Sequence, residues 1–172
     1  METDEINRIM LADPICREFY GGALALDELV EIKAMTQYIV NLDPSHMKGS
    51  HWTYLGSTLP PDHRGRVTLE FFDSFGRPPP PPLLSKLLEY AHEVIYCDIP
   101  LQHVITQTCG GWSVVVAKLR ARNYSLLDIV TKLFKGGEGE YLRNDATIYS
   151  TLRHLATLRD ESFINWDFLL KK

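Results

Sequence analysis

The amino-acid sequence predicts an α+β fold, with strands in the middle of the chain and helices before and after them. Short β-branched and apolar runs bounded by turn residues lie between residues 37 and 97, and apolar residues recur at helical spacing outside that region. The composition is that of a globular protein, with 45% hydrophobic and 23% charged residues. A chain of 172 residues can bury a sizeable core, so we predict one domain over residues 1–172, helical from about residue 109.

The first part of the chain supplies a helix and most of the predicted strands. Apolar residues at helical spacing follow an acidic start and predict a helix over residues 1–11. Residues 19–22 are predicted to form a turn, because two glycines follow each other there. The strands that the β-branched and apolar runs predict cover residues 37–42, 52–55 and 66–72, with a hairpin-like loop over residues 59–65.

Five consecutive prolines, Pro78–Pro82, follow the last of these strands. Such a run can join neither a helix interior nor a central strand. It could serve as a polyproline II ligand for a partner, or as a stiff surface connector that leads the chain into the next helix. That helix is predicted over residues 83–93 and is followed by a strand at residues 94–97 and a loop at residues 100–108.

The last part of the chain is predicted to be helical from Cys109 onward. Asn123 and the pair Gly136-Gly137 interrupt the helical pattern, and Ser125 is a predicted N-cap. The helices that result cover residues 112–122, 126–135 and 140–158.

Charge and composition argue against several classes of protein. A net charge of −4 argues against nucleic-acid binding through overall charge, although Lys118, Arg120 and Arg122 could form a local basic patch. No run approaches the ~20 apolar residues of a membrane span, and the acidic start is not that of a signal peptide. Three widely spaced cysteines indicate neither a disulfide framework nor a zinc site, so we expect a reducing compartment and no metal.

Four residues lie at the margins of these elements and together carry the groups that thiol-dependent acyl transfer needs. Cys109 is a thiol at a predicted helix start, where free N–H groups and the helix dipole lower a cysteine pKa. His51 precedes a strand and is a candidate base. Asp73 follows a strand and is a candidate orienting acid, and Gln102 is a candidate amide donor.

Local chemistry leaves alternatives open at each of these positions. Asp73 could be only a turn residue, and a free cysteine is often a small buried hydrophobe. His103 is the second candidate for the base, because it lies close to the cysteine in sequence. Gln102 and Gln107 are both candidate amide donors, and Trp52 could stack over the imidazole or belong to the core.

The motifs around these residues resemble the adenovirus-type (adenain-like) cysteine endopeptidases. The likeness covers residues 19–135 and is closest to the versions carried by Polinton/Maverick elements and adenovirus-like viruses. It rests on four pieces in a fixed order: a strand leading to Ser50-His51-Trp52, the turn Asp73-Ser74-Phe75-Gly76 followed by prolines, the pair Leu101-Gln102, and Cys109-Gly110. The segment after residue 136 has no counterpart in the family.

The resemblance implies a papain-like or adenain-like fold, with a small central mixed sheet flanked by helices. It implies His51 as base, Asp73 as orienting acid, Cys109 as nucleophile and Gln102 as oxyanion-hole donor, and thereby chooses Gln102 over Gln107. No cofactor is required, but the family is activated by a short viral peptide and by DNA. Cys97 could pair with such a peptide or be a buried structural cysteine, and the acidic charge weakens the expectation of DNA activation.

The expected function is therefore a cysteine endopeptidase that cleaves viral precursor proteins during maturation. Its expected location is the virion and the nucleus or cytoplasm of the host cell, with polypeptide substrates and no membrane. Two alternatives remain at this point: a protease that removes ubiquitin- or SUMO-like modifiers, and a non-catalytic interaction module on the same fold.

Overall fold

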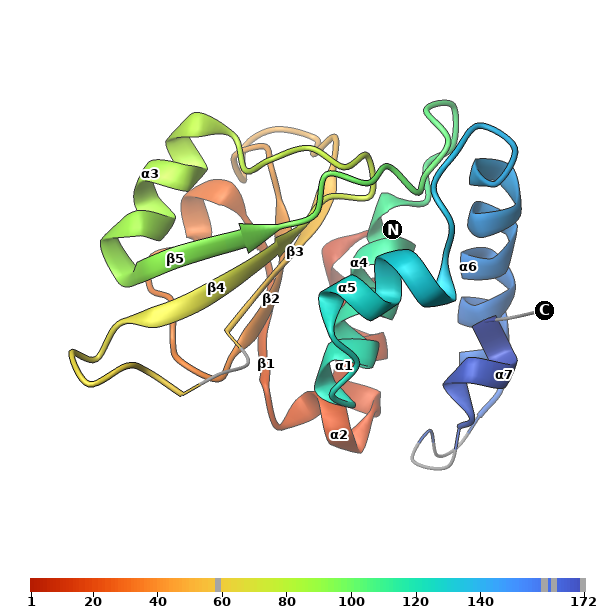
Figure 1. The fold of residues 1–172 in the computed structure, drawn as a ribbon, viewed down its shortest axis with the longest axis horizontal. Coiled ribbons are helices and arrows are strands. Elements are labelled where there is room, and N and C mark those ends of the chain that lie inside the picture. The colour runs from red at the N-terminus through yellow and green to blue at the C-terminus, as the bar shows by residue number, and fades with distance from the viewer. Residues whose placement is uncertain (58–59, 159–160, 162–163, 171–172) are drawn as a thin grey trace.

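A five-stranded mixed sheet forms the centre of the computed structural model, which describes residues 1–57, 60–158, 161 and 164–170 (Figure 1). The strands lie in sequence order across the sheet; the two outer pairs are parallel and the two inner pairs are antiparallel. The predicted α+β class is confirmed. The strands are β1 (Tyr20–Ala25), β2 (Gln37–Asn41), β3 (Trp52–Gly56), β4 (Val67–Phe72) and β5 (Ala91–Tyr96).

Helices cover both faces of the sheet. Figure 1 shows α3 on one side and α1, α2, α4 and α5 on the other, with α6 and α7 forming an outer layer beyond them. The helices are α1 (Thr3–Ala12), α2 (Pro14–Arg17), α3 (Pro81–Tyr90), α4 (Cys109–Ala121), α5 (Leu126–Asp128), α6 (Tyr141–Leu155) and α7 (Trp166–Leu170), with a 3-10 turn at Leu26–Glu28 and a π-helical turn at Ile129–Leu133.

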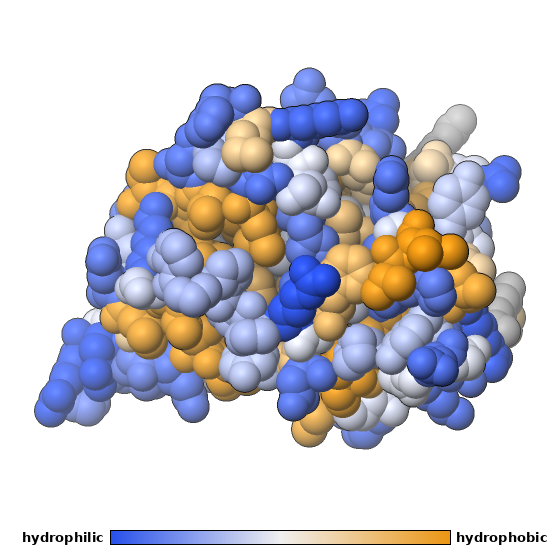
Figure 2. Space-filling model, turned by 90° about the horizontal axis from the view of Figure 1, so that it is seen from above, coloured by the Kyte–Doolittle hydropathy of each residue, from blue (hydrophilic) through white to orange (hydrophobic). Residues whose placement is uncertain are grey.

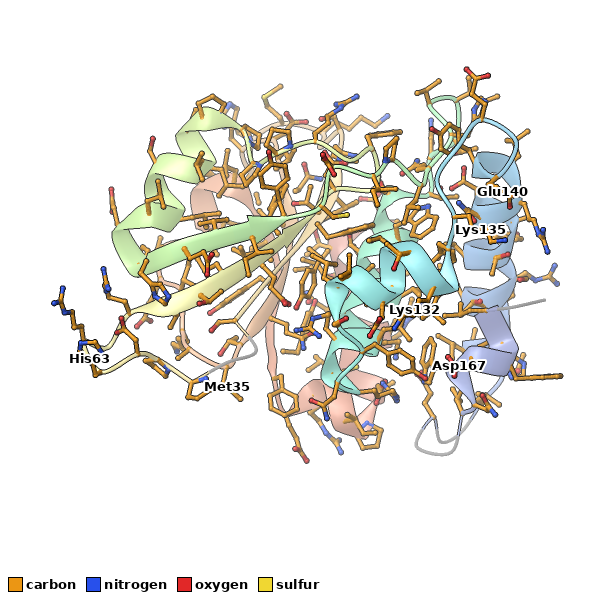
Figure 3. All side chains as sticks on the ribbon, viewed as in Figure 1. Met35, His63, Lys132, Lys135, Glu140 and Asp167 are labelled. Carbon is orange, nitrogen blue, oxygen red and sulfur yellow. The ribbon has the colours of Figure 1, made fainter. Side chains whose placement is uncertain are left out.

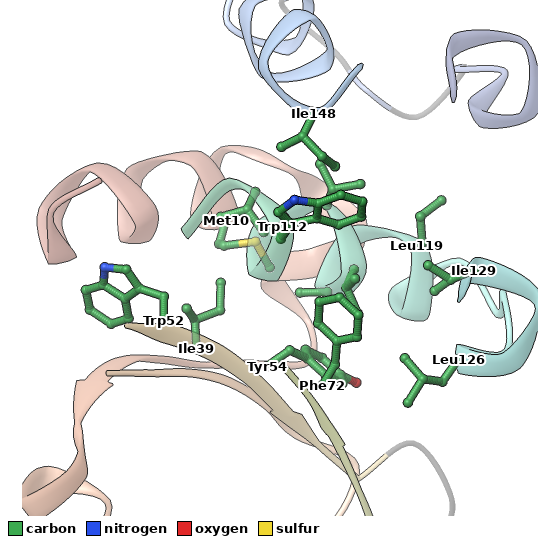
Figure 4. Packing of buried hydrophobic residues seen from close by; sticks show 14 of the residues in the cluster. Met10, Ile39, Trp52, Tyr54, Phe72, Trp112, Leu119, Leu126, Ile129 and Ile148 are labelled. Atoms are coloured by element: carbon green, nitrogen blue, oxygen red, sulfur yellow. The ribbon is translucent and has the colours of Figure 1, made fainter. Parts of the chain in front are cut away.

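Strands β2 and β3 are buried along their whole length because each face of the sheet packs on a separate apolar core. Successive side chains of a strand point to opposite faces. Ile39 and Tyr54 accordingly belong to the core beneath α4, whereas Val40 and Leu55 belong to the core beneath α3. On the α4 side, Trp112 lies between the sheet and α6 (Figure 4). Helix α6 thus packs as a second helical layer outside α4.

The turn predicted at residues 19–22 is wrong for residues 20–22, which open the edge strand β1, while Phe19 lies in the turn that precedes the strand. Two glycines disfavour a strand in isolation. Here a Cβ at Gly21 would come within 2.3 Å of the Tyr38 ring, so the missing side chain allows β1 to approach β2 closely. Packing against the neighbouring strand thus decides the structure of this segment.

The proline run leads directly into α3. Pro81 and Pro82 form the first turn of that helix, where a missing N–H costs no hydrogen bond, and Pro79 is buried. These placements favour the connector over an exposed ligand. The helix ends at Tyr90, three residues earlier than predicted, and β5 begins earlier by the same amount.

The other predicted elements differ from the observed helices and strands mainly at their ends. Ser125 caps α5 as predicted, accepting a hydrogen bond from the Asp128 N–H at 3.0 Å. The helix predicted over residues 126–135 is a short α-helix continued by a π-helical turn. Leu59, the first residue of the predicted hairpin-like loop, lies outside the described residues. Within the part of the chain that the structure describes, none of the helices combines the length and the apolar character that crossing a bilayer requires.

Candidate active site

The antiparallel pairing of β3 with β4 brings His51 and Asp73 together. His51 comes directly before β3 and Asp73 directly after β4, and the register pairs Tyr54 with Phe72, so both residues lie at the same end of the sheet. His51 Nε2 and Asp73 Oδ1 are 2.8 Å apart, and both side chains are buried. The contact uses one nitrogen of the ring and leaves Nδ1 for a second partner.

The turn after β4 holds this pair in place. The Phe75 N–H donates to Asp73 Oδ1 at 2.8 Å, and the Phe75 ring stacks on the imidazole with centroids 5.0 Å apart. Sequence reasoning missed this role of Phe75. Trp52, the alternative stacking residue, belongs to the core instead, and its Nε1–H donates to the Met1 carbonyl at 3.0 Å.

Cys109 is the first residue of α4, as predicted, and it hydrogen bonds with His51. Its sulfur also accepts the backbone N–H groups of Trp52 and Gly110. Gly110 allows this close packing, because a Cβ there would lie 3.2 Å from the Trp52 ring. The helix start, the strand start and the imidazole therefore meet at one sulfur atom.

The surroundings shift the pKa values of Cys109 and His51 in the directions that favour an ion pair between them. Burial raises the pKa of Cys109, but the hydrogen bonds from His51 and from the backbone outweigh burial and bring the pKa below its usual value. Burial lowers the pKa of His51, but the hydrogen bonds with Asp73 and Cys109 outweigh it and raise the pKa to about 9. Both shifts are in the direction that favours a thiolate beside an imidazolium.

Gln102 is held beside this pair by the same turn. The N–H groups of Leu101 and Gln102 both donate to the Ser74 carbonyl, at 2.9 and 3.0 Å. Gly76 has a φ of +68°, and a Cβ there would lie 2.7 Å from the Pro100 nitrogen. A glycine is therefore needed for the turn after β4 to pack against the backbone that leads to Gln102.

The side-chain amide of Gln102 is fixed at both ends. The Ser74 hydroxyl donates to Oε1 at 2.6 Å, and Nε2 donates to the Thr106 carbonyl at 2.9 Å and to Thr106 Oγ1 at 3.2 Å. A single N–H can serve both acceptors on Thr106, which leaves the second hydrogen of the amide for another acceptor. Neither Ser74 nor Thr106 was singled out from the sequence.

A cavity of about 580 Å³ opens at these residues, a size typical of ligand sites. Gln107 also lines it, so both glutamines considered from the sequence lie near the thiol. Its walls are largely polar. The cavity is lined by His51, Cys109, Gln102, Gln107, Asn41 and Lys48 among others. Figure 2 faces the end of the molecule from which α4 starts, where hydrophilic residues separate two areas of apolar surface.

The other candidate base does not take the place of His51. His103 Nδ1 accepts the Ile105 N–H at 3.3 Å, and its ring packs edge-on against Tyr141, so its own loop and the start of α6 engage it. His63 lies at the tip of the β3–β4 connection, on the far side of the molecule from α6 (Figure 3).

Cys97 follows β5 and is half-buried, and burial raises its pKa. Its predicted pairing with an activating peptide is not tested by this placement. Among the described residues, His, Cys, Asp and Glu side chains form no group of three or more that could hold a metal ion.

The basic patch considered from the sequence does not form. Lys118 is fully buried and contacts Asp13 at 3.0 Å. Arg120 pairs with Glu70 at 2.6 Å, and Arg122 pairs with Asp13 at 2.9 Å. Each of these cations thus has a carboxylate partner inside the protein.

Comparison with solved structures places the fold among proteases. The ASFV pS273R protease aligns with a TM-score of 0.54 and 16% identity, over 76% of this chain and 61% of that protease. The selenomethionine form of the same protease aligns with a TM-score of 0.39 and 26% identity, over 56% of this chain and 38% of the other. No protein-family model and no curated protein matches the sequence. The chain thus has the fold of a protease of which it spans less than two thirds.

Proposed function

We propose that this chain is a cysteine endopeptidase with Cys109 as nucleophile, His51 as general base and acid, and Asp73 as orienting carboxylate. The observation that carries the proposal is the chain of hydrogen bonds from Asp73 through His51 to Cys109, beside an open cavity. A nucleophile, a base and a group that orients the base are the arrangement expected for a thiol hydrolase. The fold shared with the ASFV pS273R protease supports it independently.

In the first half of the proposed reaction, the Cys109 thiolate attacks the carbonyl carbon of a peptide bond. The new carbon–sulfur bond pushes the carbonyl π electrons onto oxygen, which becomes an oxyanion. The His51 imidazolium then gives its proton to the leaving nitrogen as the carbon–nitrogen bond breaks. Asp73 stabilises the imidazolium and keeps the ring oriented, since Oδ1 holds Nε2 at 2.8 Å.

In the second half, neutral His51 takes a proton from water, and the resulting hydroxide displaces the thiolate from the acyl group. The oxyanion of each step would be held by the Cys109 backbone N–H at the start of α4 and by the Gln102 amide. Gln102 is suited to this because Ser74 and Thr106 fix its amide plane before substrate binds.

We further propose that the substrates are precursor proteins of an adenovirus-like virus or mobile element. The family resemblance of the His51, Asp73, Gln102 and Cys109 motifs supports this, together with the likeness to the ASFV pS273R protease. The contacts of the three catalytic residues need no group from another chain. We therefore propose that an activating peptide, if used, changes the rate without assembling the triad.

The test is profiling of a peptide library with the unmodified chain and with Cys109→Ala, each with and without candidate activating peptides. We expect specific cleavage by the unmodified chain and, in the variant, a rate at least about a thousandfold lower. The matched control is Cys97→Ala, which removes a half-buried thiol away from the triad and should cleave normally in the arm without an activating peptide. Equal turnover by Cys109→Ala, with circular dichroism showing that it is folded, would contradict the proposal.

A further inference from the structure

The segment between Gln102 and Cys109 carries one proposed oxyanion donor at its start and the nucleophile at its end. It has no regular secondary structure before α4, so its conformation depends on contacts with the rest of the molecule. Several of these contacts come from one place in the chain. Two adjacent buried polar residues of α6, Asn144 and Asp145, face this segment.

Asp145 accepts four hydrogen bonds from the segment and from the helix that follows it. Oδ2 accepts the His103 N–H at 2.9 Å and the Thr106 hydroxyl at 2.8 Å. Oδ1 accepts the Thr108 hydroxyl at 2.7 Å and the Trp112 Nε1–H at 2.8 Å. The carboxylate is 5% exposed, and burying it is favourable only because these donors replace water.

Asn144 holds the same segment one residue earlier. Its Nδ2 donates to the Leu101 carbonyl at 3.2 Å and to the Lys135 carbonyl at 2.9 Å. It therefore connects the residue before Gln102 with the end of the π-helical turn. The segment is tied to α6 at its start by Asn144 and along the rest of its length by Asp145.

The contacts of Asp145 lead to both halves of the proposed oxyanion site. On one side, Thr106 joins Asp145 to Gln102, because its oxygens also accept from Gln102 Nε2. On the other side, Thr108 and Trp112 flank Cys109 on α4. One carboxylate thus fixes the separation between the Gln102 amide and the backbone N–H of Cys109.

We propose that Asp145 is a positioning residue that sets the geometry of the oxyanion site through Thr106, Thr108 and Trp112. The inference rests on the proposed function for its catalytic consequence, but its structural part can be tested without any substrate. It assigns a role to α6, which lies outside the residues of the family resemblance. Asp145 does not contact His51, so it should affect stabilisation of the oxyanion and leave the thiolate–imidazolium pair unchanged.

The experiment compares the unmodified chain with Asp145→Asn, a change of nearly equal shape. The asparagine has one acceptor oxygen in place of two, so in either orientation it cannot accept all four donors, and the segment that they hold should loosen. We expect kcat to fall on the order of 10-fold or more with KM nearly unchanged, because misplaced donors weaken transition-state binding. The pH dependence of Cys109 alkylation by iodoacetamide should not change. Exchange of the His103 amide hydrogen should become faster.

Thr151→Ala is the matched control. Thr151 is a fully buried residue of the same helix, and its hydroxyl has no hydrogen-bond partner among the described residues. The fall of kcat in this variant should measure the effect of loosening α6 alone, because Thr151 makes none of the hydrogen bonds that hold the segment between Gln102 and Cys109. An equal fall of kcat in both variants, or an unchanged His103 exchange rate in Asp145→Asn, would overturn the proposal.

Thr106→Val serves as a second variant if Asp145→Asn does not fold. It removes the hydroxyl that joins Asp145 to Gln102 and should give the same loss of kcat with unchanged alkylation. Normal kcat in Thr106→Val would also overturn the proposal. If the unmodified chain cleaves no peptide, the proposed function fails, while hydrogen exchange at His103 still decides whether Asp145 holds the segment.

Discussion

Helix α4 carries two buried clusters in which a cysteine, a carboxylate and a cationic side chain meet. At its start, Cys109 lies with His51 and Asp73. Further along the same helix, Lys118 lies with Asp13, which in turn contacts Cys16. The residue types are similar, yet the pKa values of the two thiols are shifted in opposite directions.

The direction of the hydrogen bond at sulfur explains the difference. Cys109 accepts hydrogen bonds from His51 and from backbone N–H groups, which stabilise a thiolate and lower its pKa against the effect of burial. Cys16 instead donates its S–H to Asp13 Oδ2 at 3.1 Å, and the hydrogen bond that its sulfur accepts, from Arg122 Nη1, is longer at 3.7 Å. Burial, with the Asp13 carboxylate, raises the pKa of Cys16 to about 12.

A nearby positive charge is therefore not sufficient to activate a thiol. The Lys118 ammonium lies 3.0 Å from Asp13 and 2.7 Å from Glu161, so it pairs directly with these two carboxylates. The second cluster ties α4 to α2 and to Glu161. We infer that the first cluster serves chemistry and the second serves stability, and the predictions below test that division.

Asp73→Asn should have the largest effect. An asparagine keeps the shape but cannot stabilise an imidazolium or hold its tautomer, so kcat should fall on the order of a thousandfold. Stability should also fall, because the buried imidazolium loses its carboxylate partner. Steady-state kinetics on the best library peptide, together with urea unfolding, measures both quantities. A large loss of stability with normal kcat would reverse the roles of the two clusters.

The same variant should shift the pH profile. Protonation of the leaving nitrogen requires the imidazolium, so activity falls as pH rises through the pKa of His51, which is about 9. Asp73 raises that pKa, and its neutral replacement lowers it. The alkaline limb of kcat in Asp73→Asn should therefore move to lower pH, and a limb that stays near 9 would show that Asp73 does not act on the imidazole.

Lys118→Met should have the next largest effect, and on stability alone. It leaves Asp13 with Arg122 as its remaining cation and removes the cation that the Glu161 carboxylate contacts, and removing one partner of a buried ion pair costs about 3–5 kcal/mol. Urea unfolding followed by tryptophan fluorescence gives the free energy of unfolding. Activity per folded molecule should be normal.

Lys132→Met is the matched control for that variant. Lys132 pairs with Asp128 one helical turn away, but its side chain is 72% exposed (Figure 3). Such surface pairs contribute about 0.3–0.5 kcal/mol. If the two lysine variants lost equal stability, the buried cluster would not be the structural element that we infer.

The sequence predicts the α+β class and four of the five strands. The β-branched and apolar runs of β2, β3 and β4 match the burial that the sheet imposes, whereas β5 has such a run but is a largely exposed edge strand. It does not predict β1, where local glycine preferences disagree with packing against Tyr38. It predicts a continuous helix where a π-helical turn follows α5, because both give similar apolar spacing.

For the candidate site, the sequence places His51, Asp73 and Cys109 at the margins of the right elements. Their mutual contact depends on the β3–β4 register and on α4 lying against β3, which no local pattern specifies. Asp145 could not be found this way. On an amphipathic helix, an acidic residue is typical of the solvent face, and only the packing of α6 against residues 101–108 buries it.

Among the changes within the two clusters, Cys16→Ala should have the smallest effect, and it tests whether the clusters are independent. Asp13 keeps its contacts with Lys118, Arg122 and two backbone N–H groups, so losing the S–H donor should cost about 1 kcal/mol of unfolding free energy. The rate at which iodoacetamide modifies Cys109 should not change, because no hydrogen bond at that sulfur involves Cys16 among the described contacts. A slower reaction of Cys109, with Cys97→Ala unaffected, would mean that α4 transmits changes from one cluster to the other. The thiolate would then depend on the whole helix, and its activation could not be assigned to His51 and the backbone donors alone.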